Sequence, residues 1–154
     1  MKDFASDFNR ILADSYHNVL LMEETKRKYS KGSFSFRDRN AVAFLMQHEG
    51  GTKLSDVADY LKISRPSATT LIKKLESKGL VERMADPASD RNTLVKVTRK
   101  GRLFSTYQQR YRERLAARVS ADLTEEEKAA LYKGFCKLND FFVQSIQESE
   151  DIHK

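Results

Sequence analysis

The residues with the most recognisable chemistry are hydroxyls and cations that recur between positions 64 and 74. Arginine, serine and threonine side chains hydrogen-bond to the edges of nucleic-acid bases, whereas lysine pairs with phosphate oxygens. We assign base contacts to Arg65, Ser67 and Thr70. Lys73, Lys74 and Thr69 are assigned to phosphates. The full set of candidate interface residues in this stretch is Ser64, Arg65, Pro66, Ser67, Thr69, Thr70, Lys73 and Lys74. The alternative is an ordinary solvated helix face, on which lysine and serine are common.

Two short helices joined by a tight turn are predicted to position these residues. Apolar side chains repeat at i, i+3, i+4 and i+7 over 54–61 and again over 68–75. Ser64 is a good N-cap for the second helix, Pro66 suits its first turn, and Gly79 supplies a C-terminal stop. Because the apolar stripe points to a core, the other face is free to contact a ligand. Pro66, Thr70, Lys73 and Ser77 lie near the middle of this face, and Ser67, Thr69 and Lys74 flank it.

The next residues predict two strands around a polar loop. Residues 80–83 form one short strand, and 93–98 alternate apolar and polar side chains. The loop from Ala85 to Thr93 is rich in turn-forming residues and carries one long cation, Arg91. An arginine on such a loop is well placed to enter a minor groove beside the helix, and an ordinary surface hairpin is the alternative. The order of elements predicts a winged helix-turn-helix, a mainly α fold with a small β wing.

Helices are predicted on both sides of this segment. Each prediction rests on an amphipathic pattern. Ser35 and Thr98 are expected to cap two of these helices, and a capping box that begins at Thr124 is expected to open the last one. Gly50 and Gly51 are expected to end the second helix. The predicted helices cover about 3–28, 35–49, 98–119 and 124 onward.

On these residues the chain resembles the multiple antibiotic resistance regulator (MarR) family of bacterial winged-helix transcription factors. The motifs that carry the resemblance are Leu54–Ala58, Ser64–Thr69, Leu75–Arg83, Asp86-Pro87 and Val97–Gly101. The wing departs from the family pattern, because the usual Asp-Arg-Arg is replaced by Ser89-Asp90-Arg91. Arg91 still falls on the groove-reaching position. Ser89 cannot form the family's bracing ion pair, for which Asp86 or Asp90 would have to substitute.

The resemblance implies a homodimer that binds double-stranded DNA as a transcriptional regulator, expected to be a repressor. The family arrangement gives a DNA-binding lobe at 36–98 and dimerisation helices at 1–29 and 99–154 of the single chain 1–154. The terminal helices also carry more apolar surface than a domain of this size needs, which favours pairing with a second copy. A twofold protein reads a pseudo-palindromic operator. The alternative is a monomer whose terminal helices cover their own core.

Charge is unevenly distributed along the chain. Residues 53–118 hold 16 lysines and arginines against 7 acidic residues, whereas 119–154 hold 4 against 8. The basic part is therefore the predicted DNA-binding part, and its charge would give salt-dependent affinity. No apolar run is long enough to span a membrane and no signal peptide is visible, so we expect a cytoplasmic protein without a membrane partner.

No catalytic constellation is visible, and the chain is not expected to be an enzyme. His17, His48 and His153 fall on different predicted elements, and the motifs of phosphate loops and metalloproteases are missing. We expect no cofactor and no metal. Cys136 is expected to be a small packing residue, with a redox switch as the alternative. A zinc site built from Cys136, His17 and acidic residues would be a poor set of soft ligands.

A second resemblance concerns the effector. Residues 18–24 and 100–127 are similar to the branch of the family that represses fatty-acid synthesis genes in Gram-positive bacteria. That branch binds DNA better with acyl-acyl carrier protein, which implies this partner or a small apolar effector. The residues that could line an apolar pocket, or equally form ordinary core, are Phe34, Phe36, Phe44, Met46 and Phe104. The alternative function is a helical interaction protein whose basic winged helix binds a protein partner.

Overall fold

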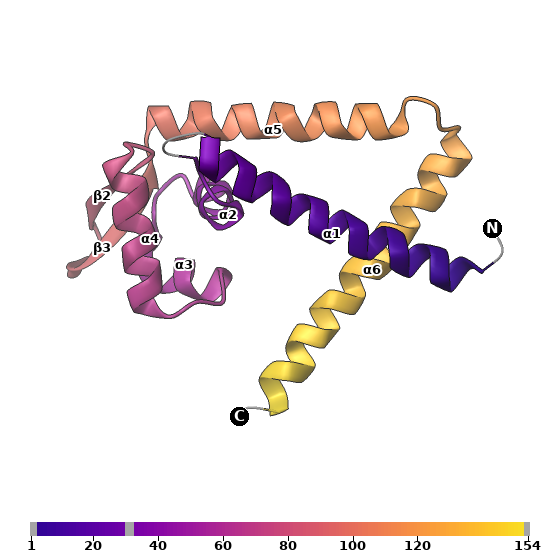
Figure 1. The fold of residues 1–154 in the computed structure, drawn as a ribbon. Coiled ribbons are helices and arrows are strands. Elements are labelled where there is room, and N and C mark those ends of the chain that lie inside the picture. Colours follow the sequence, from indigo (N-terminus) through magenta and orange to yellow (C-terminus); the bar gives the residue numbers. More distant parts are fainter. Residues whose placement is uncertain (1–2, 30–32, 153–154) are drawn as a thin grey trace. The chain divides into compact units, whose positions relative to one another are not determined.

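The computed structural model describes residues 3–29 and 33–152, without the side chains of 90–92. Its contacts divide the chain into two compact units, Met1–Gln108 and Gln109–Lys154. The elements of the first unit are α1 (Phe4–Tyr29), α2 (Phe36–Met46), β1 (Thr52–Lys53), α3 (Leu54–Tyr60), α4 (Arg65–Ser77), β2 (Val81–Asp86), β3 (Ser89–Val97) and the beginning of α5 (Arg99–Ser120) (Figure 1). The second unit holds the rest of α5 and α6 (Glu125–Ile152). The predicted fold class, mainly helical with a small β wing, is confirmed.

Helices α2, α4, α5 and α6 begin at the predicted capping residues. The Ser35 hydroxyl accepts the Asp38 N–H while the Asp38 carboxylate accepts the Ser35 N–H, a reciprocal capping box for α2. Thr124 and Glu127 form the same box at α6. At α5 the Thr98 hydroxyl accepts the Gly101 N–H at 3.0 Å. These side chains satisfy backbone donors that have no partner within the first turn of a helix.

The second helix is shorter than predicted. It ends at Met46 instead of continuing through Glu49. The Gln47 and His48 N–H groups bond to carbonyls three residues back, which tightens the last turn before the chain leaves the helix. Gly50 and Gly51 therefore belong to the connection to β1, and Gly51 adopts a positive φ of 93° there.

The sheet is larger than predicted and its order is β1-β3-β2, antiparallel throughout. The expected loop from Ala85 to Thr93 is mostly strand, because β2 extends to Asp86 and β3 begins at Ser89. A bulge between Ala85 and Asp86 shifts the register. The turn-forming residues of 85–93 indicated a loop, whereas pairing with the partner strand makes most of them strand, so the sequence pattern marked only the base of the hairpin. The two-residue strand β1 was not predicted.

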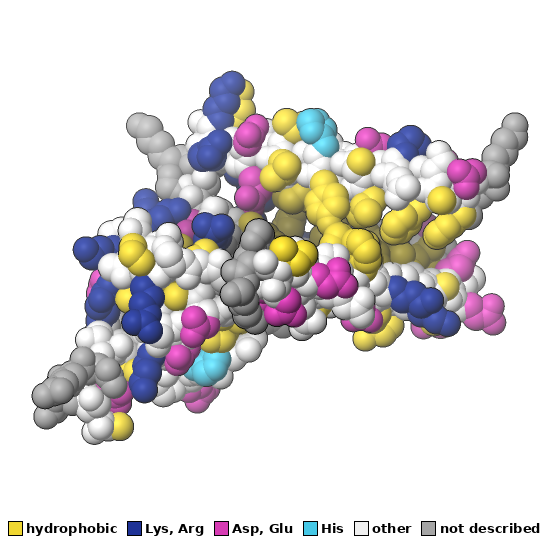
Figure 2. All heavy atoms as spheres, turned by 90° about the horizontal axis from the view of Figure 1, so that it is seen from below, with side chains coloured by type: hydrophobic (Ala, Val, Ile, Leu, Met, Phe, Trp, Pro, Cys, Tyr) yellow, Lys and Arg dark blue, Asp and Glu magenta, His cyan; other side chains and the backbone are white. Residues whose placement is uncertain are grey.

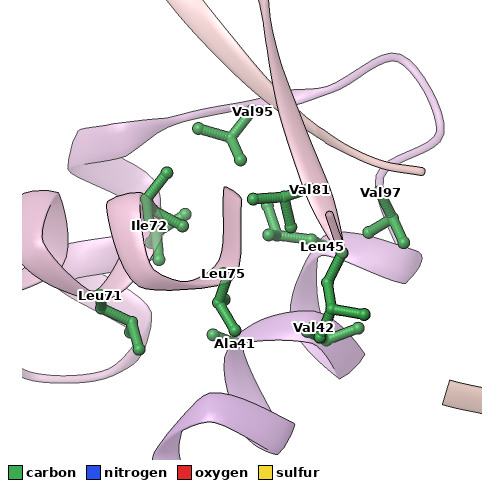
Figure 3. Packing of buried hydrophobic residues seen from close by; sticks show 11 residues of the cluster. Ala41, Val42, Leu45, Leu71, Ile72, Leu75, Val81, Val95 and Val97 are labelled. Carbon is green, nitrogen blue, oxygen red and sulfur yellow. The ribbon is translucent and has the colours of Figure 1, made fainter. Parts of the chain in front are cut away.

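The core of the first unit lies where α2, α3 and α4 pack against the sheet. The predicted stripe of α4 is buried, and Ile72 of α4 lies close to Val95 of β3 and Val81 of β2 (Figure 3). The buried cluster consists of Ala41, Val42, Leu45, Val57, Leu71, Ile72, Leu75, Leu80, Val81, Val95 and Val97. This packing orients α4 because its apolar side is fixed to the core.

The long terminal helices are different. Helices α1 and α6 contain no buried residue among those described, and α5 contains only Gly101. Large apolar side chains such as Phe4, Leu20 and Phe135 are more than half exposed. None of the helices in the described ranges is long and apolar enough to cross a membrane.

Candidate nucleic-acid interface

Helix α4 carries the candidate interface and is capped at both ends. The Ser64 hydroxyl accepts the Ser67 N–H, and Pro66 occupies the first turn. At the other end Gly79 has a φ of 71°, and the Gly79 and Leu80 N–H groups bond to the carbonyls of Glu76 and Leu75. This pair of bonds is a Schellman motif, which needs a left-handed residue that glycine supplies without strain. Both ends of α4 are thus fixed by local sequence.

The predicted interface residues lie together on one exposed face of α4. Pro66, Thr70 and Lys73 are exposed and lie opposite the buried stripe, whereas Arg65 and Ser67, also exposed, lie on its two flanks in the first turn. Of the other three, Ser64 and Lys74 are exposed and Thr69 is half-buried. The arrangement presents one long cation and short hydroxyls at the N-terminal end of the helix. Such an end can enter a major groove without a steric barrier.

The two threonine hydroxyls of α4 already donate to the backbone, and the Ser67 hydroxyl is hydrogen-bonded to that of Ser64 at 2.8 Å. Thr70 Oγ1 donates to the Pro66 carbonyl at 3.1 Å, and Thr69 Oγ1 donates to the Arg65 carbonyl at 3.0 Å. A threonine bonded in this way keeps its lone pairs and offers an acceptor, which suits the amino groups of cytosine and adenine. For Thr69 to donate to a phosphate, its hydroxyl would first have to leave the Arg65 carbonyl.

The two lysines of α4 differ in their surroundings. Lys73 is exposed and forms no ion pair within the described part of the chain. Lys74 Nζ lies 2.5 Å from Asp38 Oδ2, and the Asp38 carboxylate is buried in the first turn of α2. Lys73 is therefore available for a phosphate, whereas Lys74 already neutralises a buried acid. Sequence analysis missed Asp38 as a partner because 36 positions separate the two residues.

The wing is braced through α4. Arg83 Nε donates to Glu76 Oε2 at 3.3 Å, which joins β2 to the last part of α4. Asp86 does not take the bracing role in this structure, because its carboxylate accepts the Ala88 N–H at 2.9 Å within the wing turn. The backbone of Arg91 belongs to β3, but the side chains of Arg91 and Asp90 lie outside the described residues.

The residues predicted to line an apolar pocket lie in different places. Phe34 and Phe104 face each other with ring centroids 4.6 Å apart, and both line a hollow of about 490 Å³. Phe44 instead stacks on Tyr60 at 4.1 Å, and Phe36 is exposed. Met46 lines a second hollow of about 290 Å³. Phe34 and Phe104 therefore share a hollow, whereas Met46 lines a different one.

Cys136 is half-buried on α6, next to an exposed tyrosine. A hydrogen bond between the two side chains, together with the charge of the thiolate, raises the pKa of Tyr132 above its ordinary value. The described residues contain no group of three or more histidine, cysteine or acidic side chains arranged to hold a metal ion.

Positive charge accompanies the candidate interface. Residues 53–118, which include α3, α4 and both long strands, have a net formal charge of +9. Figure 2 shows several Lys and Arg side chains on the lobe that contains α4, β2 and β3. This charge favours a polyanion as the ligand of the exposed face.

The helix-turn-helix followed by a β-hairpin defines a winged-helix protein of the type that presents a helix to DNA. The MarR family profile matches residues 44–93, which run from the last turn of α2 through α3 and α4 into β3.

Two curated relatives come from Bacillus subtilis (strain 168). The chain is 32% identical over 95 residues to YdgJ, an uncharacterized HTH-type transcriptional regulator, with 62% of this chain and 58% of YdgJ covered. It is 36% identical over 61 residues to the HTH-type transcriptional regulator MhqR, with 40% of this chain and 42% of MhqR covered. The matches thus span about half the length of these relatives. Their names agree with the prediction that the chain is not an enzyme.

Solved structures show the same fold over nearly the whole chain. Streptococcus pneumoniae FabT in complex with DNA has a TM-score of 0.77 at 23% identity, covering 91% of this chain and 98% of FabT. MepR, a regulator of the Staphylococcus aureus multidrug efflux pump MepA, has a TM-score of 0.68 at 18% identity, with the same coverage. At these identities the likeness establishes the architecture.

Proposed function

We propose that this chain is a sequence-specific DNA-binding transcriptional regulator that acts as a repressor. In this proposal it binds a pseudo-palindromic operator as a homodimer. The observation that carries the proposal is the exposed N-terminal face of α4, where Arg65, Ser67 and Thr70 surround a capped helix end. The FabT structure of the same fold contains DNA, and both curated relatives are named transcriptional regulators.

A dimer is the assembly that this function needs. Two recognition helices about 34–36 Å apart, roughly one turn of DNA, would meet the same face of the duplex. The apolar side chains left exposed on α1 and α6 provide the surface that a second copy would cover. We propose that residues 1–29 and 99–154 serve dimerisation and that 36–98 form the DNA-binding lobe.

The effector is proposed to be apolar, in keeping with the fatty-acid branch of the family. The hollow beside Phe34 and Phe104 is also lined by Leu80 and Leu103, and its size lies within the range of ordinary ligand pockets. Lys78 and Lys100 lie at the same hollow and could meet a terminal acidic group. The FabT likeness supports the fold; the effector class rests on this lining and on the sequence resemblance.

The experiment is a binding titration of the purified chain with DNA from upstream of its own gene and with random DNA of equal length. We expect tight binding of a dimer to the upstream fragment that survives excess random competitor. Equal, weak binding to both DNAs would contradict a specific regulator and would favour the alternative, a winged helix that binds a protein partner. A parallel titration with long-chain acyl-acyl carrier protein tests the effector separately. Unchanged DNA affinity there would contradict only the acyl effector.

A further inference from the structure

A buried carboxylate connects α2 with α4. Asp38 is 1% exposed, and its Oδ2 atom accepts from Lys74 Nζ at 2.5 Å and from the Ser35 N–H at 2.7 Å. Lys74 reaches this acid from the C-terminal half of α4, while Ser35 caps α2. One oxygen atom therefore fixes the start of α2 and holds a side chain of α4 at the same time.

The energetic role of Lys74 follows from the burial of Asp38. An ionised carboxylate out of contact with water is stable only when a cation or several donors compensate its charge. Lys74 supplies the only cation within ion-pair distance of Asp38 among the described residues. If Lys74 moved to a phosphate, it would leave that buried charge unpaired. Lys73, one residue earlier, is exposed and does not pair with a buried acid in the described part of the chain.

The same turn of α2 also holds α1. Arg39, next to Asp38, donates to Glu23 of α1 at 2.5 Å and to the Phe34 carbonyl at 2.7 Å. Both Arg39 and Glu23 are largely buried in this pair, with side-chain exposures of 17% and 26%. The first turn of α2 thus contacts the N-terminal helix through Arg39 and the candidate recognition helix through Asp38.

We propose that Asp38 and Lys74 are positioning residues that set the orientation of α4 against the lobe, and that Lys74 is not a phosphate contact. This inference rests on the proposed DNA-binding function. Base-reading side chains tolerate only small errors in helix position, about 0.5 Å and 10–20°. The ion pair anchors the C-terminal half of α4, which determines where Arg65 lies at the other end.

The first test is a double-mutant cycle on the free energy of unfolding, with Asp38→Asn, Lys74→Met and the double variant. Asparagine keeps an oxygen that can accept the Ser35 N–H. We expect Lys74→Met alone to be the least stable variant, because it strands the carboxylate, and the double variant to recover part of the loss. The matched control is Lys73→Met combined with Asp38→Asn, which should be additive. Additivity for Lys74 and Asp38 would overturn the ion pair as an anchor.

The second test measures the ratio of dissociation constants for random and upstream DNA, which is independent of the fraction of folded protein. We expect Asp38→Asn and Lys74→Met each to lower this ratio by about fivefold or more, the effect of weakening one base contact. The salt dependence of log K should not change for Lys74→Met, whereas Lys73→Met should reduce its slope by about one unit.

The positioning role would be overturned if Asp38→Asn kept the ratio and Lys74→Met reduced the salt slope, because Lys74 would then be a phosphate contact. Lys74→Arg should restore the ratio in a positioning role, since its charge can still pair with Asp38. A wild-type ratio near one would overturn the proposed function and the positioning role with it. The double-mutant cycle on unfolding tests the Asp38–Lys74 ion pair as an anchor, whatever the result of the DNA titrations.

Discussion

At the scale of the residue, Arg65 is the side chain with the longest reach on the exposed end of α4. It is exposed, and none of its side-chain atoms is engaged in an ion pair within the described structure. We expect Arg65→Ala to weaken binding to the upstream DNA by about 1–3 kcal/mol and to reduce discrimination between sequences. Titrations with cognate and random DNA measure both effects. Arg118→Ala on α5, which removes the same charge elsewhere, is the control, and equal losses on both DNAs for Arg65→Ala would exclude base reading.

Lys73 has a different role at the same scale. As a free lysine on the flank of α4, it should contact a phosphate and contribute to every DNA sequence alike. We expect Lys73→Ala to weaken cognate and random binding by similar factors and to flatten the plot of log K against log salt by about one unit. Affinity measurements at four or more salt concentrations give this slope. A slope equal to that of the wild type would remove Lys73 from the phosphate contacts.

The sequence identified the exposed face of α4 but not the bonds within it. Periodicity decides which side chains point away from the core, and local capping signals fix where the helix begins. It cannot show that Thr69 donates to a carbonyl or that Lys74 pairs with Asp38, because such contacts depend on rotamers and on residues far apart in the chain. The Ser35-x-x-Asp38 spacing was a signal for the capping box, yet nothing in it indicated the second partner of Asp38.

At the scale of the element, the start of α5 lies unusually close to the sheet. A Cβ atom placed on Gly101 would lie 2.1 Å from the Leu80 carbonyl oxygen and 2.5 Å from Val97 Cγ1. We expect Gly101→Ala to lower the free energy of unfolding by about 1–3 kcal/mol, because the backbone of α5 must move away from β2 and β3. Urea unfolding measures the loss. Gly134→Ala on α6 is the matched control, since nothing lies within 4 Å of its Cβ position. Equal free energies of unfolding for the two variants would mean that the close approach of α5 to the sheet does not restrict the side chain at position 101.

The turn between α3 and α4 contains a residue in an unfavourable conformation. Lys62 has a φ of 51°, in the left-handed region, where it closes α3 in the way that Gly79 closes α4. Side chains other than glycine cost roughly 1–2 kcal/mol in this region, and glycine costs about 0.5–1 kcal/mol in lost chain entropy. We therefore expect Lys62→Gly to raise the free energy of unfolding by up to about 1 kcal/mol in urea titrations. Asp59→Gly, inside α3, should lower the free energy of unfolding. If both variants were less stable than the wild type, strain at Lys62 would be refuted.

The start of a helix could be predicted where a capping residue marks it. The ends of elements that depend on pairing within the sheet were harder to predict. Ser64, Thr98 and Thr124 each begin a helix as predicted, because the cap is a local interaction. The end of α2 and the extent of the wing depend on how the chain meets the sheet. β1 has only two residues, paired with Leu94 and Val95, which is too short for any periodic signal.

At the scale of the whole molecule, the two parts of the chain differ in charge and in burial. Residues 53–118 have a net formal charge of +9, whereas 119–154 have a net charge of −4. Helix α6 adds many apolar side chains yet buries none of them. A segment that neither attracts DNA nor supplies a core within its own chain needs another apolar surface. A second copy supplies one in a symmetric way, and that assembly also doubles the number of recognition helices.

The dimer can be tested by placing a charge in the apolar stripe of α6. Phe135 is 61% exposed in the single chain. We expect Phe135→Glu to shift the protein from dimer to monomer in sedimentation equilibrium, because a carboxylate would have to be buried at the interface. Gln144→Glu is the matched control, since it adds the same charge about two and a half turns further along α6, on the opposite side of the helix.

Loss of the dimer should also lower affinity for the upstream DNA far more than for random DNA, because only the specific site needs both recognition helices at a fixed spacing. An unchanged dimer in Phe135→Glu would mean that the stripe lies outside the interface. A wild-type protein that sediments as a monomer at micromolar concentration would remove the basis for a palindromic operator, while the fold of the winged helix and the role of Arg65 would still be open to the tests above.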